Sequence, residues 1–137
     1  MILIKKIFDL RFLKFGLVGV INTFSGLSII YFCKFYINLG DLISNLIGYA
    51  IGLCISFYLN SRWTFKYKGM QINAILKFVL VIFIAYLLNI TCVLFLINGL
   101  HVDGYYAQPF GILPYFLFCY LGCRLWVFNT DDKRNKY

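Results

Sequence analysis

The chain has 137 residues, of which 62% are hydrophobic and only 13% are charged, and its mean hydropathy of +0.82 excludes an ordinary soluble globular domain. Its net charge of +8 would suit nucleic acid in a soluble protein, but these cations flank apolar runs, so no nucleic-acid partner is expected and an anionic membrane surface fits better. The composition therefore predicts a membrane protein.

Four apolar runs follow one another along the chain. They cover residues 15–33, 42–59, 78–100 and 104–123. Each is close to the roughly 20 residues that cross about 30 Å of hydrocarbon. A signal peptide would have a shorter apolar region followed by a small-residue cleavage site, and the first run fits neither condition. The sequence thus predicts an all-α membrane protein with four transmembrane helices.

The cations predict the orientation of these helices. The N-terminal tail, the connection from 61 to 77 and the C-terminal tail from 124 hold twelve of the thirteen Lys and Arg residues, and only Lys34 lies elsewhere. Short loops rich in Lys and Arg stay on the cytoplasmic side of a membrane. Both termini and the central connection are therefore predicted to be cytoplasmic, in a multi-pass membrane protein.

One pattern occurs twice, 63 residues apart. Trp63 and Phe65 match Trp126 and Phe128, and in the same way the triplet 13–15, Leu-Lys-Phe, matches the triplet 76–78. Because both helical hairpins share one predicted orientation, this is a parallel repeat. We expect a single transmembrane domain over 1–137, divided into repeat 1 (about 11–65), a cytoplasmic connection (about 66–75), repeat 2 (about 76–128) and a cytoplasmic tail (129–137).

Polar residues inside the apolar runs predict where a groove would lie. A primary amide in hydrocarbon needs partners for its donors and its acceptor, and Asn22, Asn45 and Asn89 all lie in these runs. Thr23 adjoins Asn22, and glycines at spacings of three and four in the first two runs are expected to pack the helices together. The N-terminal half is the more polar one and is expected to line any groove.

No Asp or Glu lies inside the four runs, so no buried carboxylate can carry a proton across the membrane. This disfavours proton-coupled export of the small multidrug resistance type. His101 is interpreted as a solvated loop residue, and the five cysteines as structural thiols in the membrane. No enzyme activity, metal site or cofactor is predicted.

Three motifs resemble the GtrA family of small four-helix membrane proteins. They are Phe15 with Val18-Gly19 and Asn22-Thr23, then Asn60-Ser61-Arg62-Trp63-Thr64-Phe65, and finally Arg124-Leu125-Trp126-Val127-Phe128. The resemblance covers about residues 11 to 128. The family pattern reads approximately Asn-Arg-any-Trp-Thr-Phe, and here Ser61 stands where Arg is common, with Arg62 following it.

The resemblance implies a flippase that moves a polyprenyl-phosphate-linked monosaccharide from the cytoplasmic to the outer leaflet. A separate membrane glycosyltransferase would then use the sugar on a polysaccharide or cell-wall glycan. Four short helices enclose little space, so a homo-oligomer is also expected. An alternative from another class is a non-transporting subunit that docks or positions the glycosyltransferase, and this role would depend on the connection from 66 to 77.

Candidate ligand-binding residues follow from the motifs and from the polar residues of the apolar runs. Arg62 and Arg124 are expected to bind the phosphate, because a guanidinium offers forked donors that match its oxygens. The candidates for the sugar, the isoprenoid and the groove are Asn22, Thr23, Asn45, Asn60, Trp63, Phe65, Asn89, Trp126 and Phe128. Ordinary anchoring at the cytoplasmic membrane face is the alternative reading for both Arg-Trp motifs.

Overall fold

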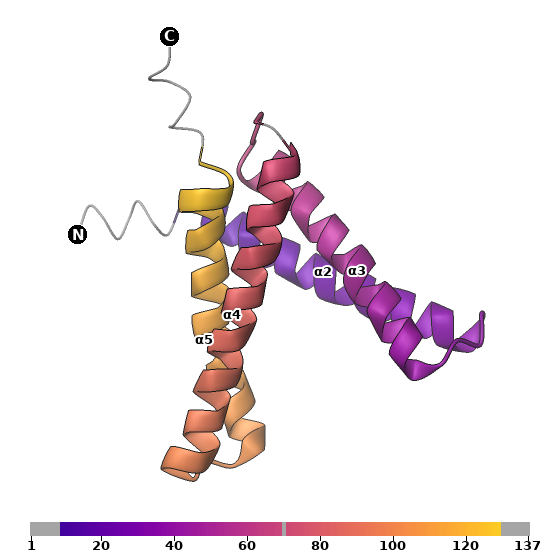
Figure 1. The fold of residues 1–137 in the computed structure, drawn as a ribbon, viewed down its shortest axis with the longest axis vertical. Helices are drawn as coiled ribbons and strands as arrows, with labels where there is room; N and C mark the ends of the chain where they lie inside the picture. Colours follow the sequence, from indigo (N-terminus) through magenta and orange to yellow (C-terminus); the bar gives the residue numbers. More distant parts are fainter. Residues whose placement is uncertain (1–8, 70, 130–137) are drawn as a thin grey trace. The chain divides into compact units, whose positions relative to one another are not determined.

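The computed structural model describes residues 9–69 and 71–129, and these residues form helices and short connections without a strand (Figure 1). The elements in chain order are α2 (Leu10–Phe35), α3 (Asp41–Leu59), η1 (Asn60–Thr64), α4 (Gln71–Leu100), α5 (Gly104–Gly122) and η2 (Cys123–Val127). The four α-helices are long and apolar enough to cross a membrane. The prediction of an all-α, multi-pass membrane protein with four transmembrane helices is confirmed.

The helices extend beyond the apolar runs. α2 begins at Leu10 and α4 at Gln71, so Lys14 and Lys77 lie on helices and the connection between the hairpins is shorter than the expected 66–75. Lys and Leu are good helix formers, so each of these helices begins before its apolar run. The Asp9 side chain caps α2 by accepting a hydrogen bond from the backbone N–H of Arg11 at 3.0 Å.

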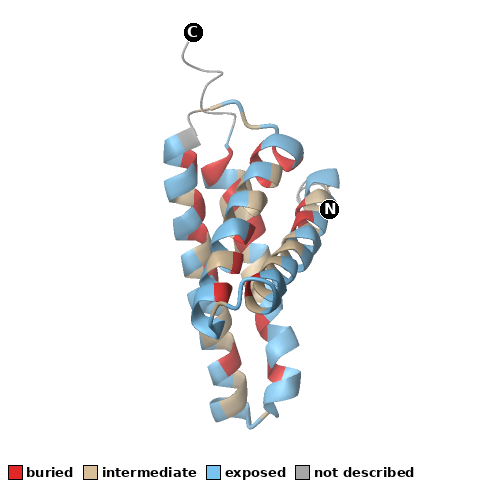
Figure 2. Cartoon of the chain, turned by 90° about the vertical axis from the view of Figure 1, so that its right-hand side faces the viewer, coloured by how far each residue is buried: buried red, intermediate tan, exposed pale blue. Residues whose placement is uncertain are grey.

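The chain divides into two units between Lys66 and Tyr67. In the first unit α2 packs against α3 and η1, and in the second unit α4 packs against α5 and η2. Each unit is thus one helical hairpin, and buried residues occupy only narrow strips of its helices (Figure 2). Many large apolar side chains outside these strips are exposed, as expected for side chains that face lipid.

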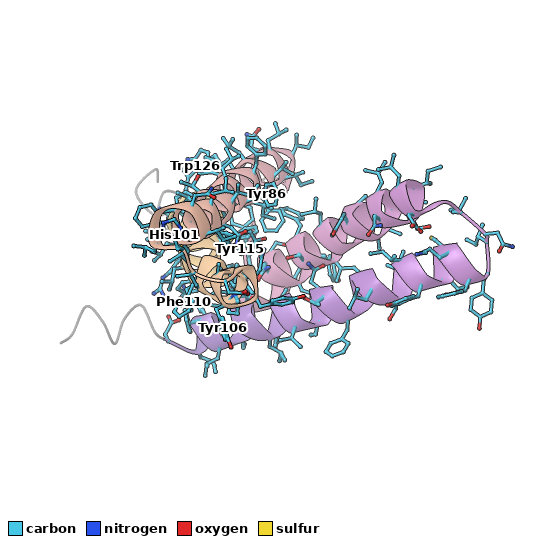
Figure 3. The ribbon with its side chains drawn as sticks, turned by 90° about the horizontal axis from the view of Figure 1, so that it is seen from below. Tyr86, His101, Tyr106, Phe110, Tyr115 and Trp126 are labelled. Atoms are coloured by element: carbon cyan, nitrogen blue, oxygen red, sulfur yellow. The ribbon has the colours of Figure 1, made fainter. Side chains whose placement is uncertain are left out.

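Aromatic side chains contribute much of this exposed surface in the second hairpin. Tyr86, Tyr106 and Phe110, labelled in Figure 3, have 54%, 71% and 58% of their surface exposed. Tyr and Phe at such positions suit the hydrocarbon and the membrane boundary, since their rings are apolar and the tyrosine hydroxyl reaches water.

Both hairpins turn in the same way at the loop between their two helices. Asn38 and His101, 63 residues apart, adopt the left-handed backbone conformation with φ of 57° and 53°, which Asn and His tolerate better than most residues. In each case the next backbone N–H donates to a carbonyl six residues earlier, at 3.0 Å: Leu39 to Cys33 and Val102 to Leu96. A left-handed residue thus ends the first helix of each hairpin, and this gives His101 a conformational role in an exposed loop.

A close helix contact is also repeated. A methyl group on Gly48 of α3 would come within 2.4 Å of the Ile30 side chain, and one on Gly111 of α5 within 2.5 Å of Val93. Gly48 and Gly111 are 63 residues apart, and so are Ile30 and Val93. Each hairpin therefore needs glycine at this position, because a branched side chain of the partner helix fills the place of a Cβ atom.

An ion pair accounts for the cation outside the three cationic segments. The Lys34 ammonium lies 2.7 Å from the Asp41 carboxylate, across the loop that joins α2 to α3. The pair is solvent-exposed and contributes little to stability, but Asp41 offsets the charge of Lys34 in a loop that is predicted to be extracytoplasmic. The matching positions in the second hairpin are Ile97 and Gly104, so only the first hairpin has this pair.

Candidate functional site

Each hairpin ends in one turn of π-helix at the same repeat position. η1 continues α3 and η2 continues α5, and their last bonds run from the N–H of Phe65 to the carbonyl of Asn60 (2.9 Å) and from Phe128 to Cys123 (2.8 Å). These bonds close over five residues instead of four. Because π-turns shift the helix face by one inserted residue and occur frequently at functional sites, the two tryptophan motifs are the natural place to look for a site.

A lysine lies beside the tryptophan of each π-turn. The Lys14 ammonium lies 5.1 Å from the ring centroid of Trp63, and the Lys77 ammonium 5.5 Å from that of Trp126. Such cation–π contacts contribute about 0.5–1 kcal/mol at exposed sites, and they leave ammonium hydrogens free to bind phosphate oxygens. Each hairpin end therefore presents an indole and a cation side by side.

Sequence reasoning did not single out these two lysines as site residues. The signal was present in the repeated triplets at 13–15 and 76–78. Their pairing with tryptophan became visible only because α2 and α4 begin early enough to carry Lys14 and Lys77 alongside the π-turns.

The two arginines predicted to bind phosphate do not occupy equivalent positions. Arg62 is the counterpart of Leu125, and Arg124 is the counterpart of Ser61. The Arg62 side chain is exposed and has no hydrogen bond or ion pair within residues 9–69 and 71–129, so its guanidinium is open to a ligand. Arg124 donates a hydrogen bond to the Tyr120 hydroxyl and lies 5.7 Å from that ring centroid. The cation that recurs in the repeat is thus lysine.

The two phenylalanines of the motifs are buried. Phe65 packs against Phe15 and Phe128 against Phe78, in both cases with ring centroids 6.2 Å apart. Phe128 also contacts Tyr67, with centroids 5.6 Å apart. These contacts join the π-turn to the first helix of the same hairpin, whereas Trp63 and Trp126 remain exposed.

A row of polar side chains follows one face of α3 into η1. Ser56, Asn60 and Thr64 recur every four residues, and Asn60 is only 2% exposed. The Asn60 amide donates to the Ser56 hydroxyl at 3.3 Å. The Oδ1 atom of Asn60 and the Oγ1 atom of Thr64 are buried, with no hydrogen-bond partner in the part of the chain that the structure describes. Each such atom destabilises the fold by about 1–3 kcal/mol.

Asn22 extends this row onto α2. A methyl group on Gly52 would come within 2.8 Å of the Asn22 Oδ1 atom, so the absence of a Cβ at Gly52 makes room for this amide one turn before Ser56. The Asn22 Oδ1 atom is the third buried oxygen for which the described residues supply no partner. We call Asn22, Ser56, Asn60 and Thr64 the polar row.

The other predicted groove residues lie elsewhere. The Thr23 hydroxyl and the Asn45 amide each donate to the backbone carbonyl four residues earlier, at 3.0 and 2.8 Å, so the helix itself provides a partner. Asn45 is near the start of α3, roughly 22 Å along the helix from Asn60. Asn89 belongs to the second hairpin, where its amide lies against Gly111.

Comparison with known proteins gave two curated relatives. The chain is 33% identical over 55 residues to a bactoprenol-linked glucose translocase of Salmonella phage P22, which is 40% of this chain and 46% of that relative. It is 28% identical over 71 residues to a bactoprenol-linked glucose translocase of Shigella flexneri, which is 52% of this chain and 57% of that relative. The chain thus spans about half the length of the curated relatives it matches.

The match to a protein family is more extensive. The family model described as "GtrA/DPMS, transmembrane domain" matches residues 14–128. This range includes both π-turns and both lysine–tryptophan pairs. It also includes all four transmembrane helices, except for the first residues of α2. The chain therefore belongs to the GtrA/DPMS transmembrane-domain family.

Proposed function

We propose that this protein translocates a polyprenyl-phosphate-linked monosaccharide from the cytoplasmic to the outer leaflet of a bacterial-type inner membrane, without a covalent step. The observation that carries the proposal is the polar row, which holds three buried oxygens without partners in a chain that is 62% hydrophobic. The names of the two curated relatives support the same class of cargo.

The chemistry of such a lipid fits the first hairpin. Its tail can stay in hydrocarbon, but its phosphodiester charge and its sugar hydroxyls would lose their hydrogen bonds to water, at several kcal/mol per group. The polar row offers hydrogen bonds to the sugar. Lys14 and Arg62, at the η1 end of the same hairpin, offer cations to the phosphate.

The proposed movement is passive. No acidic residue in the apolar runs could couple transport to protons, so net flow would follow the concentration of the lipid. Consumption of the sugar by a membrane glycosyltransferase on the outer side would draw it forward. The proposal includes assembly of several copies of the chain, because four helices enclose little space.

The test is exchange in liposomes. Purified protein should make a short-chain polyprenyl phosphoglucose accessible on both leaflets without ATP or a proton gradient. Asn22→Leu and Asn60→Leu should each slow exchange by about tenfold, the equivalent of one hydrogen bond. Lys68→Ala, an exposed change outside the hairpins, is the control and should leave the rate unchanged.

A negative result would favour the docking role. If the unaltered protein gave no more exchange than empty liposomes, while its co-expression raised the membrane activity of a polyprenyl-phosphate glycosyltransferase, translocation would be wrong. Substitutions in the connection from 66 to 77 would then reduce that activity, and those in the polar row would not.

A further inference from the structure

The polar row has no polar counterpart in the second hairpin. At the positions 63 residues after Asn22, Ser56, Asn60 and Thr64 stand Ala85, Cys119, Cys123 and Val127. All four of these counterparts are buried. A row of amides and hydroxyls in one hairpin is thus matched, position by position, by small or apolar side chains in the other.

The backbone of the two hairpins is nevertheless alike along these positions. Both have the same outer turn, the same glycine contact at Gly48 and Gly111 and the same π-turn. The second hairpin therefore forms this architecture with apolar side chains, and the fold does not require the polar ones. Buried polar groups without partners destabilise a membrane hairpin, so their presence in the first hairpin points to a ligand.

The atoms without partners indicate what that ligand is. The Oδ1 atoms of Asn22 and Asn60 are hydrogen-bond acceptors, and the Thr64 hydroxyl can donate or accept. A phosphodiester carries only acceptors and a negative charge, so it cannot satisfy a carboxamide oxygen. A hydroxyl group can donate to both amides, and none of the four side chains in the row is charged.

We infer that the polar row is a binding site for the sugar hydroxyls of the lipid, present once per chain, and that the second hairpin is a packed copy that binds no sugar. This inference rests on the proposed function, since it takes the cargo to be a lipid-linked sugar. It separates two tasks within the first hairpin: the row binds the neutral head, and the phosphate is held by cations outside the row, namely Lys14 and Arg62.

The second hairpin supplies matched variants for the test. Asn60→Cys and Thr64→Val place in the first hairpin the side chains that the second hairpin already buries at those positions. Two probes of equal charge are compared on the purified full chain in detergent: a short-chain polyprenyl phosphoglucose, and the methyl phosphodiester of the same prenol. Binding is followed by the fluorescence of the chain's two tryptophans or by calorimetry.

The unaltered protein should bind the glucose probe at least about tenfold more tightly than the methyl probe. Asn60→Cys and Thr64→Val should each reduce this preference by about fivefold to tenfold, the equivalent of one hydrogen bond, and leave the affinity for the methyl probe unchanged. Cys123→Ala, at the position equivalent to Asn60, is the control and should not alter the preference. The melting temperature of Asn60→Cys should not fall, because the change removes a buried oxygen without a partner, which offsets the lost hydrogen bond from the Asn60 amide to Ser56.

Several results would overturn the inference. A wild-type chain that binds both probes equally, or neither, has no sugar site in this row. Equal losses for both probes in Asn60→Cys, together with a lower melting temperature, would give Asn60 a structural role. A loss of preference in Cys123→Ala would place sugar in both hairpins. The proposed translocation is tested by a different result. If the chain prefers the glucose probe but gives no exchange in liposomes, the sugar site is supported and the transport role is contradicted.

Discussion

At the scale of single residues, Arg62 differs from the two lysines of the lysine–tryptophan pairs and from Arg124. Lys14 and Lys77 are engaged with indole rings, and Arg124 is bound to the Tyr120 hydroxyl. The Arg62 side chain is exposed and contacts no acidic partner within the residues that the structure describes. Its forked donors are therefore open to a phosphate, beside the ammonium hydrogens that Lys14 keeps free.

Arg62→Lys tests this assignment because it keeps the charge and removes the fork. If phosphate is bound by two parallel hydrogen bonds, exchange in liposomes should fall by roughly tenfold, while expression and membrane insertion persist. Arg62→Ala should be slower still. Equal rates for Arg and Lys would favour the anchoring role at the membrane surface, in which only the charge matters.

The sequence alone predicted part of this residue-level picture. Asn22 and Asn60 stood out because a primary amide in an apolar run needs partners, and both belong to the polar row. The roles of Lys14 and Lys77 could not be predicted from charge, since a cation beside an apolar run already satisfies the rule for cytoplasmic loops. The residue numbers alone show that Arg62 and Arg124 are not 63 residues apart. The structure shows the consequence, because Arg62 is the third residue of η1 and Arg124 is the second residue of η2.

At the scale of elements, the π-turn sets the direction of Trp63. Deleting Ser61 should convert η1 to ordinary α-helix, which changes the direction of Trp63 around the axis relative to Lys14. Exchange in liposomes should then fall by at least about tenfold, with unchanged helix content by circular dichroism. Deleting Lys68, which lies after the turn, is the control, and an equal loss in that variant would contradict a specific role for η1.

The elements also show where prediction from sequence stops. Four helices were predictable because each has an apolar run of spanning length, but the apolar run ends at the membrane boundary and the helix does not. The early starts of α2 and α4 depend on helix formers such as Lys and Leu outside the runs. A π-turn depends on one inserted residue, and the spacing of apolar side chains in a short polar motif does not reveal it.

At the scale of the whole chain, the orientation in the membrane remains a prediction from the distribution of cations. On a cysteine-free background, a cysteine at Tyr36 or Val102 should react with an impermeant label from outside the cell. Cysteines at Met70 and Lys133, which lie outside the described residues, should react only from inside. Labelling of position 70 from outside would contradict both the orientation and the parallel character of the repeat.

The repeat of 63 residues is visible in the sequence, because tryptophan, phenylalanine and lysine recur at one offset. The structure divides the chain into two hairpins between Lys66 and Tyr67. The difference between the hairpins was less visible. It required knowing which positions are buried, since Asn60 and Cys123 differ in chemistry but occupy the same buried place.

The two outer turns and the two π-turns together determine a length. Between these turns α3 and α5 have the same 19 residues each, which is roughly 28 Å of helix. Both hairpins are therefore matched to one hydrocarbon thickness. A bilayer that is thinner or thicker than this length has the same hydrophobic mismatch with both hairpins. The chain as a whole is therefore suited to membranes of one thickness.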